Sequence, residues 1–186
     1  MYNSIEERKK TMKATNVDGN KVLILGSYPG EKSLTSGEYY IDNRNKFWDL
    51  LSEVFGEDIK KDDLKAKSIF LDSHSIILWD VCECCKRNGS GDSGIVREKP
   101  NKIVEFIQRS NVEVIFCNGS KAFRLFNKYF KDKELINKSG NIIKAKHVGL
   151  SDYYKLISSS GAANRFGDKR LLNWKRIKTS GNDHND

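Results

Sequence analysis

The chain is organised around the stretch KVLILGSYPGEKSLTSGEYYIDNRNKFW, residues 21–48. Its first part, 21–27, reads as a buried parallel strand, because VLIL is continuously apolar rather than alternating. The glycine turn GSYPG follows, and a loop rich in hydroxyl and aromatic side chains then leads to a helix that opens with RNKFW. Open α/β proteins form ligand sites where a buried strand ends in such a turn, so we expect a site here.

Further strands follow at regular intervals. Apolar runs predict strands at 75–81, 111–117 and 153–157. The segment 141–150 is a weaker candidate, because its alternation is poor. Helical patterns separate the strands predicted at 21–27, 75–81, 111–117 and 153–157, which is the arrangement of a parallel sheet with helices on both faces.

Helical patterns connect these strands, at 44–55, 58–66, 100–110, 121–130 and 165–178. Asn43 is the expected N-cap of the first helix, and Pro100 is expected just inside the start of the third. The sequence therefore predicts the α/β class: a three-layer α/β/α sandwich around a central, mainly parallel sheet of about four strands.

Length and composition fit one globular domain. A chain of 186 residues lies in the usual range of ~100 to ~200 residues for a single domain. No linker rich in Pro, Gly and Ser divides it, so we expect one domain over 21–178. Residues 1–20 are expected to form a frayed arm or a short leading helix, and the polar tail 179–186 is expected to be disordered.

The charge balance favours a polyanionic partner. Lys and Arg number 33 against 25 Asp and Glu, which gives a net charge of +8. Neutralising phosphates with such cations releases counterions and drives DNA binding. Charge alone does not decide, because lysine-rich proteomes contain basic proteins with no nucleic-acid role. The N-terminus lacks the apolar core of a secretion signal, so a cytoplasmic protein with access to chromosomal DNA is expected, with no membrane partner.

No conventional catalytic set is present in the sequence. The motifs of zinc proteases and phosphate loops are missing. Of the three histidines, His74 and His147 are expected to be structural, and His184 lies in the tail. Three of the four cysteines form CECC, a spacing unlike that of zinc sites, and this segment is expected to begin a helix or a loop. We therefore expect reduced thiols and neither a metal nor a cofactor.

Four ordered segments carry a more specific signal: GSYPG with YYIDNRNKFW, ILWDVCECCKRNGSGDS, FCNGSKAFRLF and LISSSGAANRF. Together they resemble the uracil-DNA glycosylase superfamily, and most closely its hypoxanthine-DNA (deoxyinosine) glycosylase branch. That branch has a G-S-aromatic-P-G turn followed by YY-x-H-P-R-N-x-F-W, then LWDV, N-G-x-x-A and an L-P-S-T-S-P-A loop. The resemblance spans about residues 21–177.

The chain departs from the family pattern in two loops. Asp42 and Asn43 stand where the family usually has His-Pro, and Ile157 and Gly161 replace prolines of the last loop. Fewer prolines are expected to loosen both loops. The asparagines of the pattern are intact.

The resemblance implies a monofunctional DNA glycosylase of base excision repair, with hypoxanthine as the preferred base. Asn45 becomes the catalytic candidate, because an amide can orient water and donate to the departing base although it cannot act as a base at neutral pH. Phe47 is the expected base-stacking ring, and Asn118 is expected to read the base edge. The full base-binding set is Gly26, Ser27, Tyr28, Tyr40, Phe47 and Asn118. The residues expected on the DNA backbone are Ser158, Ser159, Ser160 and Arg165.

Each of these assignments has an ordinary structural alternative. Asn45 could be a hydrogen bonder at a helix start, Phe47 a core residue and Asn118 part of an Asn-Gly turn. The serine loop could be plain and solvated, and Arg165 an ordinary surface charge.

Rival functions also stay open at this point. The expected partner is DNA that contains a deaminated base, bound by a monomer. Uracil or a G·U mismatch is an alternative substrate, because its carbonyl beside a ring N–H matches that of hypoxanthine. A nucleic-acid-binding module of the same fold without catalysis is the alternative from another class, motivated by Tyr28 and the loop departures. A site for a free nucleotide has no phosphate loop to support it.

Overall fold

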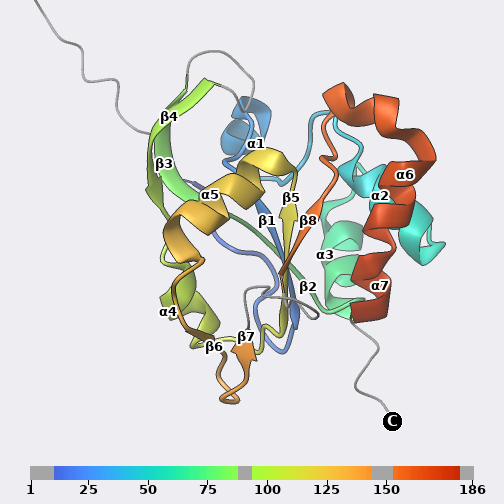
Figure 1. Ribbon diagram of the computed structural model, residues 1–186. Helices are drawn as coiled ribbons and strands as arrows, with labels where there is room; N and C mark the ends of the chain where they lie inside the picture. The colour runs from blue at the N-terminus through green and yellow to red at the C-terminus, as the bar shows by residue number, and fades with distance from the viewer. Residues whose placement is uncertain (1–10, 88–93, 144–152, 181–186) are drawn as a thin grey trace, which may run out of the picture.

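The computed structural model describes residues 11–87, 94–143 and 153–180 (Figure 1). A four-stranded parallel sheet forms its centre, with the order β2-β1-β5-β8. The strands are β1 (Val22–Gly26), β2 (Ile76–Asp80), β5 (Val114–Asn118) and β8 (Tyr153–Leu156). All four lie where the apolar runs predict them, so the central sheet of the predicted α/β sandwich is confirmed.

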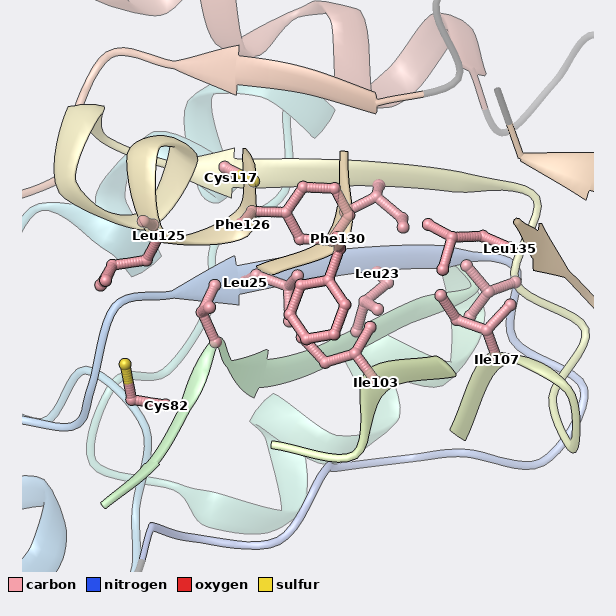
Figure 2. Packing of buried hydrophobic residues seen from close by; sticks show 14 of the residues in the cluster. Leu23, Leu25, Cys82, Ile103, Ile107, Cys117, Leu125, Phe126, Phe130 and Leu135 are labelled. Carbon is pink, nitrogen blue, oxygen red and sulfur yellow. The ribbon is translucent and has the colours of Figure 1, made fainter. Parts of the chain in front are cut away.

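The two faces of the sheet are covered by separate helical layers, as Figure 1 shows. On one face, Leu23 and Leu25 pack with Phe126 and Phe130 of α5 (Ser120–Phe130). Ile103 and Ile107 of α4 (Ile103–Ile107) complete this core, which is drawn in Figure 2. The alternation of VLIL between two buried faces explains why the run is continuously apolar.

The opposite face carries the second core. Val22 and Ile24 pack there against α2 (Phe47–Phe55), α3 (Leu64–Ser73) and the C-terminal helices. The C-terminal helices of this core are α6 (Gly167–Trp174) and α7 (Arg176–Ser180), and the short helix η2 (Gly161–Phe166) precedes them. The single helix predicted over 165–178 is thus three short ones, and the first two residues of the predicted tail belong to α7.

Several helix boundaries differ from the predictions. Asp63 accepts a hydrogen bond from the backbone N–H of Ala66 at 2.9 Å, so α3 begins after it rather than near residue 58. The residue before α2 is Lys46, not Asn43. The loop after GSYPG also contains a short helix, α1 (Glu31–Ser36), which the sequence did not predict because EKSLTS has one large apolar residue.

A two-stranded antiparallel ribbon replaces two predicted elements. Strands β3 (Cys82–Arg87) and β4 (Ile95–Pro100) pair beside the main sheet, and Cys82 lies opposite Pro100. CECC is therefore strand rather than the start of a helix or loop. Pro100 ends a strand, where its missing N–H removes no ladder bond, and does not open α4.

The remaining strands are short. Strand β6 (Leu135–Ile136) pairs with β7 (Ile142–Ile143), so the predicted strand 141–150 is reduced to its first residues within the described part. Residues 144–150 of that prediction lie outside the described residues. The cysteines at 82, 84, 85 and 117 are all buried free thiols.

The N-terminal segment from residue 11 lies along the edge of the sheet instead of fraying. The backbone N–H of Thr15 donates to the carbonyl of Leu78 at 3.0 Å, and the Thr15 hydroxyl accepts from the backbone N–H of Leu78 at 2.9 Å. The indole of Trp79 donates to the carbonyl of Met12 at 3.1 Å. These bonds fix residues 11–16 against β2; residues 1–10 of the predicted arm lie outside the described residues.

Within the three described ranges, no helix combines the length and the apolar character needed to cross a bilayer. The same ranges contain no group of three or more His, Cys, Asp or Glu side chains arranged to hold a metal ion.

Candidate functional site

Three neighbouring strands end in one row at the carboxyl edge of the sheet. Gly26 of β1 lies in register with Asp80 of β2, and Asn118 of β5 flanks it on the other side, since Leu25 pairs with Cys117. Strand alternation turns all three toward the face that carries α2. Asp80 and Asn118 are 2% and 7% exposed, so a buried carboxylate and a buried amide stand on either side of a residue without a side chain.

Gly26 is required for a steric reason. A Cβ atom at this position would overlap Oδ1 of Asp80 and would lie 3.1 Å from the hydroxyl oxygen of Tyr40. The space above the end of β1 is therefore closed by one carboxylate and one phenol. This is the point at which the opening stretch folds back on itself, because Tyr40 lies 14 residues further along the chain.

Tyr40 and Phe47 form a parallel stack. Their ring centroids are 3.9 Å apart and their planes differ by 8°. Phe47 is completely buried, and its ring also contacts Trp48 and Trp174 edge-on at 5.2 and 5.5 Å. A base cannot reach Phe47 in this conformation, which differs from the stacking role predicted for it. Tyr40 is partly exposed and is the outer ring of the stack.

The backbone of Tyr40 is unusual. Its φ is 56°, in the left-handed region that bulky residues seldom occupy. Such conformations persist where surrounding contacts fix them, and they concentrate at ligand sites. Two contacts hold this loop: the Trp48 indole donates to the carbonyl of Tyr39 at 3.1 Å, and Glu38 pairs with Lys67 at 3.2 Å.

The Glu38–Lys67 pair forms one wall of a cavity of about 460 Å³ behind the tyrosine loop. Lys67 is 3% exposed, and its ammonium group lies 5.4 Å from the centroid of the Trp48 ring. A buried lysine is tolerated because it is paired. This cavity lies between α3 and the N-terminal segment and does not include Gly26 or Asn118.

Asn45 lies between the tyrosine loop and α2. Its side-chain carbonyl accepts a hydrogen bond from the backbone N–H of Phe47 at 3.0 Å, and its own N–H donates to the carbonyl of Asp42 at 2.8 Å. The side chain is partly exposed. Asn45 thus makes the helix-start hydrogen bond of the structural alternative, and this bond also fixes the orientation of its amide.

Asp42 replaces the stiffness that a proline would give this loop. Its carboxylate accepts from the backbone N–H of Arg44 at 3.0 Å and pairs with the Arg44 guanidinium at 2.8 Å. These hydrogen bonds, more than the charge of Lys32 at 3.6 Å, hold the pKa of Asp42 well below its usual range. The expected loosening at this departure is not what the structure shows.

Asn118 is joined to the serine loop. Its amide nitrogen donates to Oγ of Ser159 at 2.8 Å, and its carbonyl accepts from the Ser159 N–H at 2.9 Å. Ser159 is 1% exposed, so its hydroxyl is not available to a DNA phosphate in this structure, contrary to the prediction. Its carbonyl accepts from the N–H of Lys46 at 2.8 Å, which brings the serine loop against the residues around Asn45.

The rest of the serine loop is held by hydrogen bonds on its inner side and is accessible on its outer side. Arg170, which is buried, donates to the carbonyl of Ser160 at 3.5 Å and to the side chain of Asn164 at 3.1 Å. The carbonyl of Arg44 lies so close to Gly161 that a Cβ there would be 2.8 Å from the oxygen. Of the residues predicted to contact the DNA backbone, Ser160 and Arg165 are exposed and Ser158 is partly exposed.

Two predicted base-binding residues of the glycine turn are less accessible. Tyr28 is 8% exposed, and its ring belongs to the core on the α4 and α5 face, away from Tyr40 and Phe47. Ser27 is 6% exposed, and its carbonyl accepts from the N–H of Cys82 at 3.1 Å. The turn therefore shapes the site through Gly26.

Sequence reasoning missed two residues of the site. Asp80 lies beside Gly26, and its position at the end of a buried strand was the available signal. Arg170 has the ordinary appearance of a charged helix residue, and nothing in its spacing indicates that it braces Ser160.

Comparisons with known proteins show the family of the chain. The family model of the Uracil DNA glycosylase superfamily matches residues 12–177. A protein named hypoxanthine DNA glycosylase from Methanosarcina barkeri is 30% identical over 146 residues, which cover 74% of this chain and 92% of that protein. A second one, from Methanosarcina acetivorans, is 30% identical over 172 residues, 91% of this chain and 97% of that protein.

A solved structure shares the fold. The solution NMR structure of a candidate uracil DNA glycosylase from Methanosarcina acetivorans superposes with a TM-score of 0.72 at 28% sequence identity. The match covers 92% of this chain and 98% of that one.

Proposed function

The chain belongs to the uracil DNA glycosylase superfamily, and we propose that it is a monofunctional DNA glycosylase that hydrolyses the N-glycosidic bond of a deaminated base, preferably hypoxanthine, in base excision repair. The names of its relatives support a DNA glycosylase. The choice of base is the part of the proposal that rests on the resemblance to those relatives.

One observation carries the proposal: the stacked pair of Tyr40 and Phe47 stands over the side-chain-free end of β1, next to an oriented asparagine. The chain of contacts runs from Gly26 to the Tyr40 hydroxyl, from the Tyr40 ring to Phe47, and from the Phe47 N–H to Asn45. An enzyme that acts on a base outside the duplex needs such a ring and such an amide. We assign the stacking surface to Tyr40, with Phe47 as its support.

The chemistry follows from the charges that develop. Cleavage of the glycosidic bond gives an oxocarbenium-like sugar and a departing base that carries negative charge. The carbonyl of Asn45 orients a water molecule toward the sugar, or its NH2 group donates to the departing base; an amide has no basic lone pair for proton abstraction at neutral pH. We assign the base edge to the second N–H of the Asn118 amide, since its first N–H is bonded to Ser159.

DNA backbone binding is assigned to the outer face of the serine loop. Ser158, Ser160 and Arg165 are accessible, and the braced loop would meet a phosphate without being reordered. The net charge of +8 supports a polyanionic partner. The proposed unit is a monomer that uses no cofactor.

A panel of lesions tests the proposal. The protein is incubated with duplexes that contain deoxyinosine, a G·U pair or an A·U pair, and with single-stranded uracil DNA, and abasic sites are then cleaved with alkali. Fastest strand scission at deoxyinosine, and none before alkali, is the expected result. Faster release of uracil would replace the substrate by the alternative. Salt-dependent binding without release of any base would mean that the chain is a binding module.

A further inference from the structure

Asp80 is the buried charged group at the site that the proposed chemistry does not use. It ends β2 in the segment ILWDV, and its carboxylate fills the space in front of Gly26. The side chain is 2% exposed. Burial of a carboxylate costs free energy unless donors surround it, so its surroundings decide what it does.

Three separate segments meet at Asp80. Thr11, from the N-terminal segment, donates from Oγ1 to Oδ2 of Asp80 at 3.2 Å and from its backbone to the carbonyl of Glu83 at 2.6 Å. Asn101, which follows β4, donates from its amide to the backbone carbonyl of Asp80 at 2.8 Å. The third segment is the tyrosine loop.

The tyrosine loop approaches the carboxylate at Tyr40. Oδ1 of Asp80 and the hydroxyl of Tyr40 converge on the same point in front of Gly26. Burial and then the charge of Asp80 raise the pKa of the Tyr39 phenol far above its usual value. A carboxylate has only acceptor atoms, and that of Asp80 accepts from the Thr11 hydroxyl. An amide in its place would present a donor group on one side.

We propose that Asp80 is a positioning residue of the base pocket: held by Thr11, it acts through Tyr40 to fix the aromatic wall that stands over Gly26. The inference rests on the proposed function and deepens it. It explains why the left-handed backbone of Tyr40 is maintained, and it gives the N-terminal segment a part in the site, although Thr11 lies 69 residues from Asp80 in the chain.

Isosteric substitutions test the proposal. Asp80→Asn keeps the shape of the side chain and exchanges one acceptor for a donor, and Thr11→Val removes the hydroxyl that holds Asp80. Thr15→Val is the matched control: it removes a hydroxyl of the same segment that bonds the backbone of Leu78 and does not contact Asp80.

Single-turnover base release from saturating deoxyinosine duplex is measured for each variant, with duplex affinity and thermal unfolding. Asp80→Asn is expected to slow release by about tenfold or more, because hydrogen bonds to a charged group are among the strong ones. Thr11→Val is expected to slow base release by about threefold. The variant that carries both substitutions is expected to release base no more slowly than Asp80→Asn alone, since Thr11 acts through Asp80. Duplex affinity is expected to stay within about twofold in all variants, since none of them removes a phosphate contact.

A second readout needs no activity. Amide hydrogen exchange of the peptide 38–42 in the free protein is expected to accelerate in Asp80→Asn and Thr11→Val but not in Thr15→Val, with α5 unchanged. If the wild-type protein releases no base, the proposed function fails, and this exchange measurement still decides whether Asp80 fixes the loop.

The proposal is overturned if folded Asp80→Asn releases base at the wild-type rate, or if the effects of Thr11→Val and Asp80→Asn multiply. It is equally overturned if Thr15→Val slows release as much as Thr11→Val, because the segment would then act through stability alone. If Asp80→Asn does not fold, the rates of base release of Thr11→Val and Thr15→Val are compared instead, and equal rates overturn the proposal.

Discussion

Replacing Gly26 by alanine tests the geometry at the end of β1. The added methyl would overlap Oδ1 of Asp80 and contact the Tyr40 hydroxyl at 3.1 Å. Neither group can retreat easily, because Asp80 is 2% exposed and bonded to Thr11, and Tyr40 is stacked on Phe47. The backbone at Gly26 is that of an ordinary strand, so the methyl acts through space alone.

The magnitude follows from these contacts. Adding a methyl group to a packed site costs about 1–3 kcal/mol of unfolding free energy. A displacement of about 1 Å at a group that positions substrate can lower the rate about a hundredfold. We therefore expect Gly26→Ala to slow base release strongly, while its free energy of unfolding falls only modestly.

The control lies in the same turn. No atom lies within 4 Å of a Cβ built on Gly30, so Gly30→Ala is expected to change stability by less than about 0.5 kcal/mol and to leave the rate unchanged. Chemical denaturation and single-turnover release from deoxyinosine DNA are measured for both variants. If Gly26→Ala matches Gly30→Ala in rate, the steric account of the pocket is wrong.

Three further predictions concern the ring stack, the loop before α2 and the core. Tyr40→Ala is expected to slow base release, because it removes about 1–3 kcal/mol of stacking, and to change the affinity for a duplex with an abasic or mismatched site only a little. If Tyr40→Phe, which keeps the ring, slowed base release equally, the ring would not be the group that matters. The pKa of Asp42 is depressed in the folded state, so its stabilising effect is complete above the unfolded pKa of about 4 and is lost as pH falls through the folded value. The stability difference between wild type and Asp42→Asn should therefore be present at pH 7, shrink below about pH 4, and also shrink with salt; a difference that is constant with pH would refute the pairing with Arg44. Phe126→Ala, in the core drawn in Figure 2, is expected to cost about 3–5 kcal/mol in denaturant unfolding, and a loss below about 1 kcal/mol would contradict the packing described.

The central sheet was predictable because its inner strands β1 and β5 are buried on both faces. Such strands leave a continuous apolar run, as 22–25 and 114–117 do, and few other elements produce this pattern. The ribbon of β3 and β4 has no such run. CECC shows no alternation of polar and apolar residues, and Pro100 is as typical of a helix start as of a strand end. The sequence of these two segments therefore did not indicate that they pair.

The sequence indicated which segments form the site, but not which of their side chains are buried and which are accessible. Both Tyr40 and Phe47 belong to the first motif, and only the structure shows that Tyr40 is the outer ring and Phe47 its buried support. The replacement of His-Pro by Asp42 and Asn43 was expected to loosen a loop, yet the Asp42 carboxylate accepts from the Arg44 N–H. Contacts such as Thr11 to Asp80 depend on tertiary packing and leave no local pattern.

The most direct measurement compares single-turnover hypoxanthine release by wild type, Asn45→Ala and Asn111→Ala from a saturating deoxyinosine duplex. Asn111 lies just before β5, at the opposite edge of the sheet from Asn118, and serves as the control. We expect Asn45→Ala to release the base about a hundredfold or more slowly, with duplex affinity nearly unchanged, and Asn111→Ala to match wild type. No base release by the wild-type protein, or an unchanged rate in Asn45→Ala, would contradict the account.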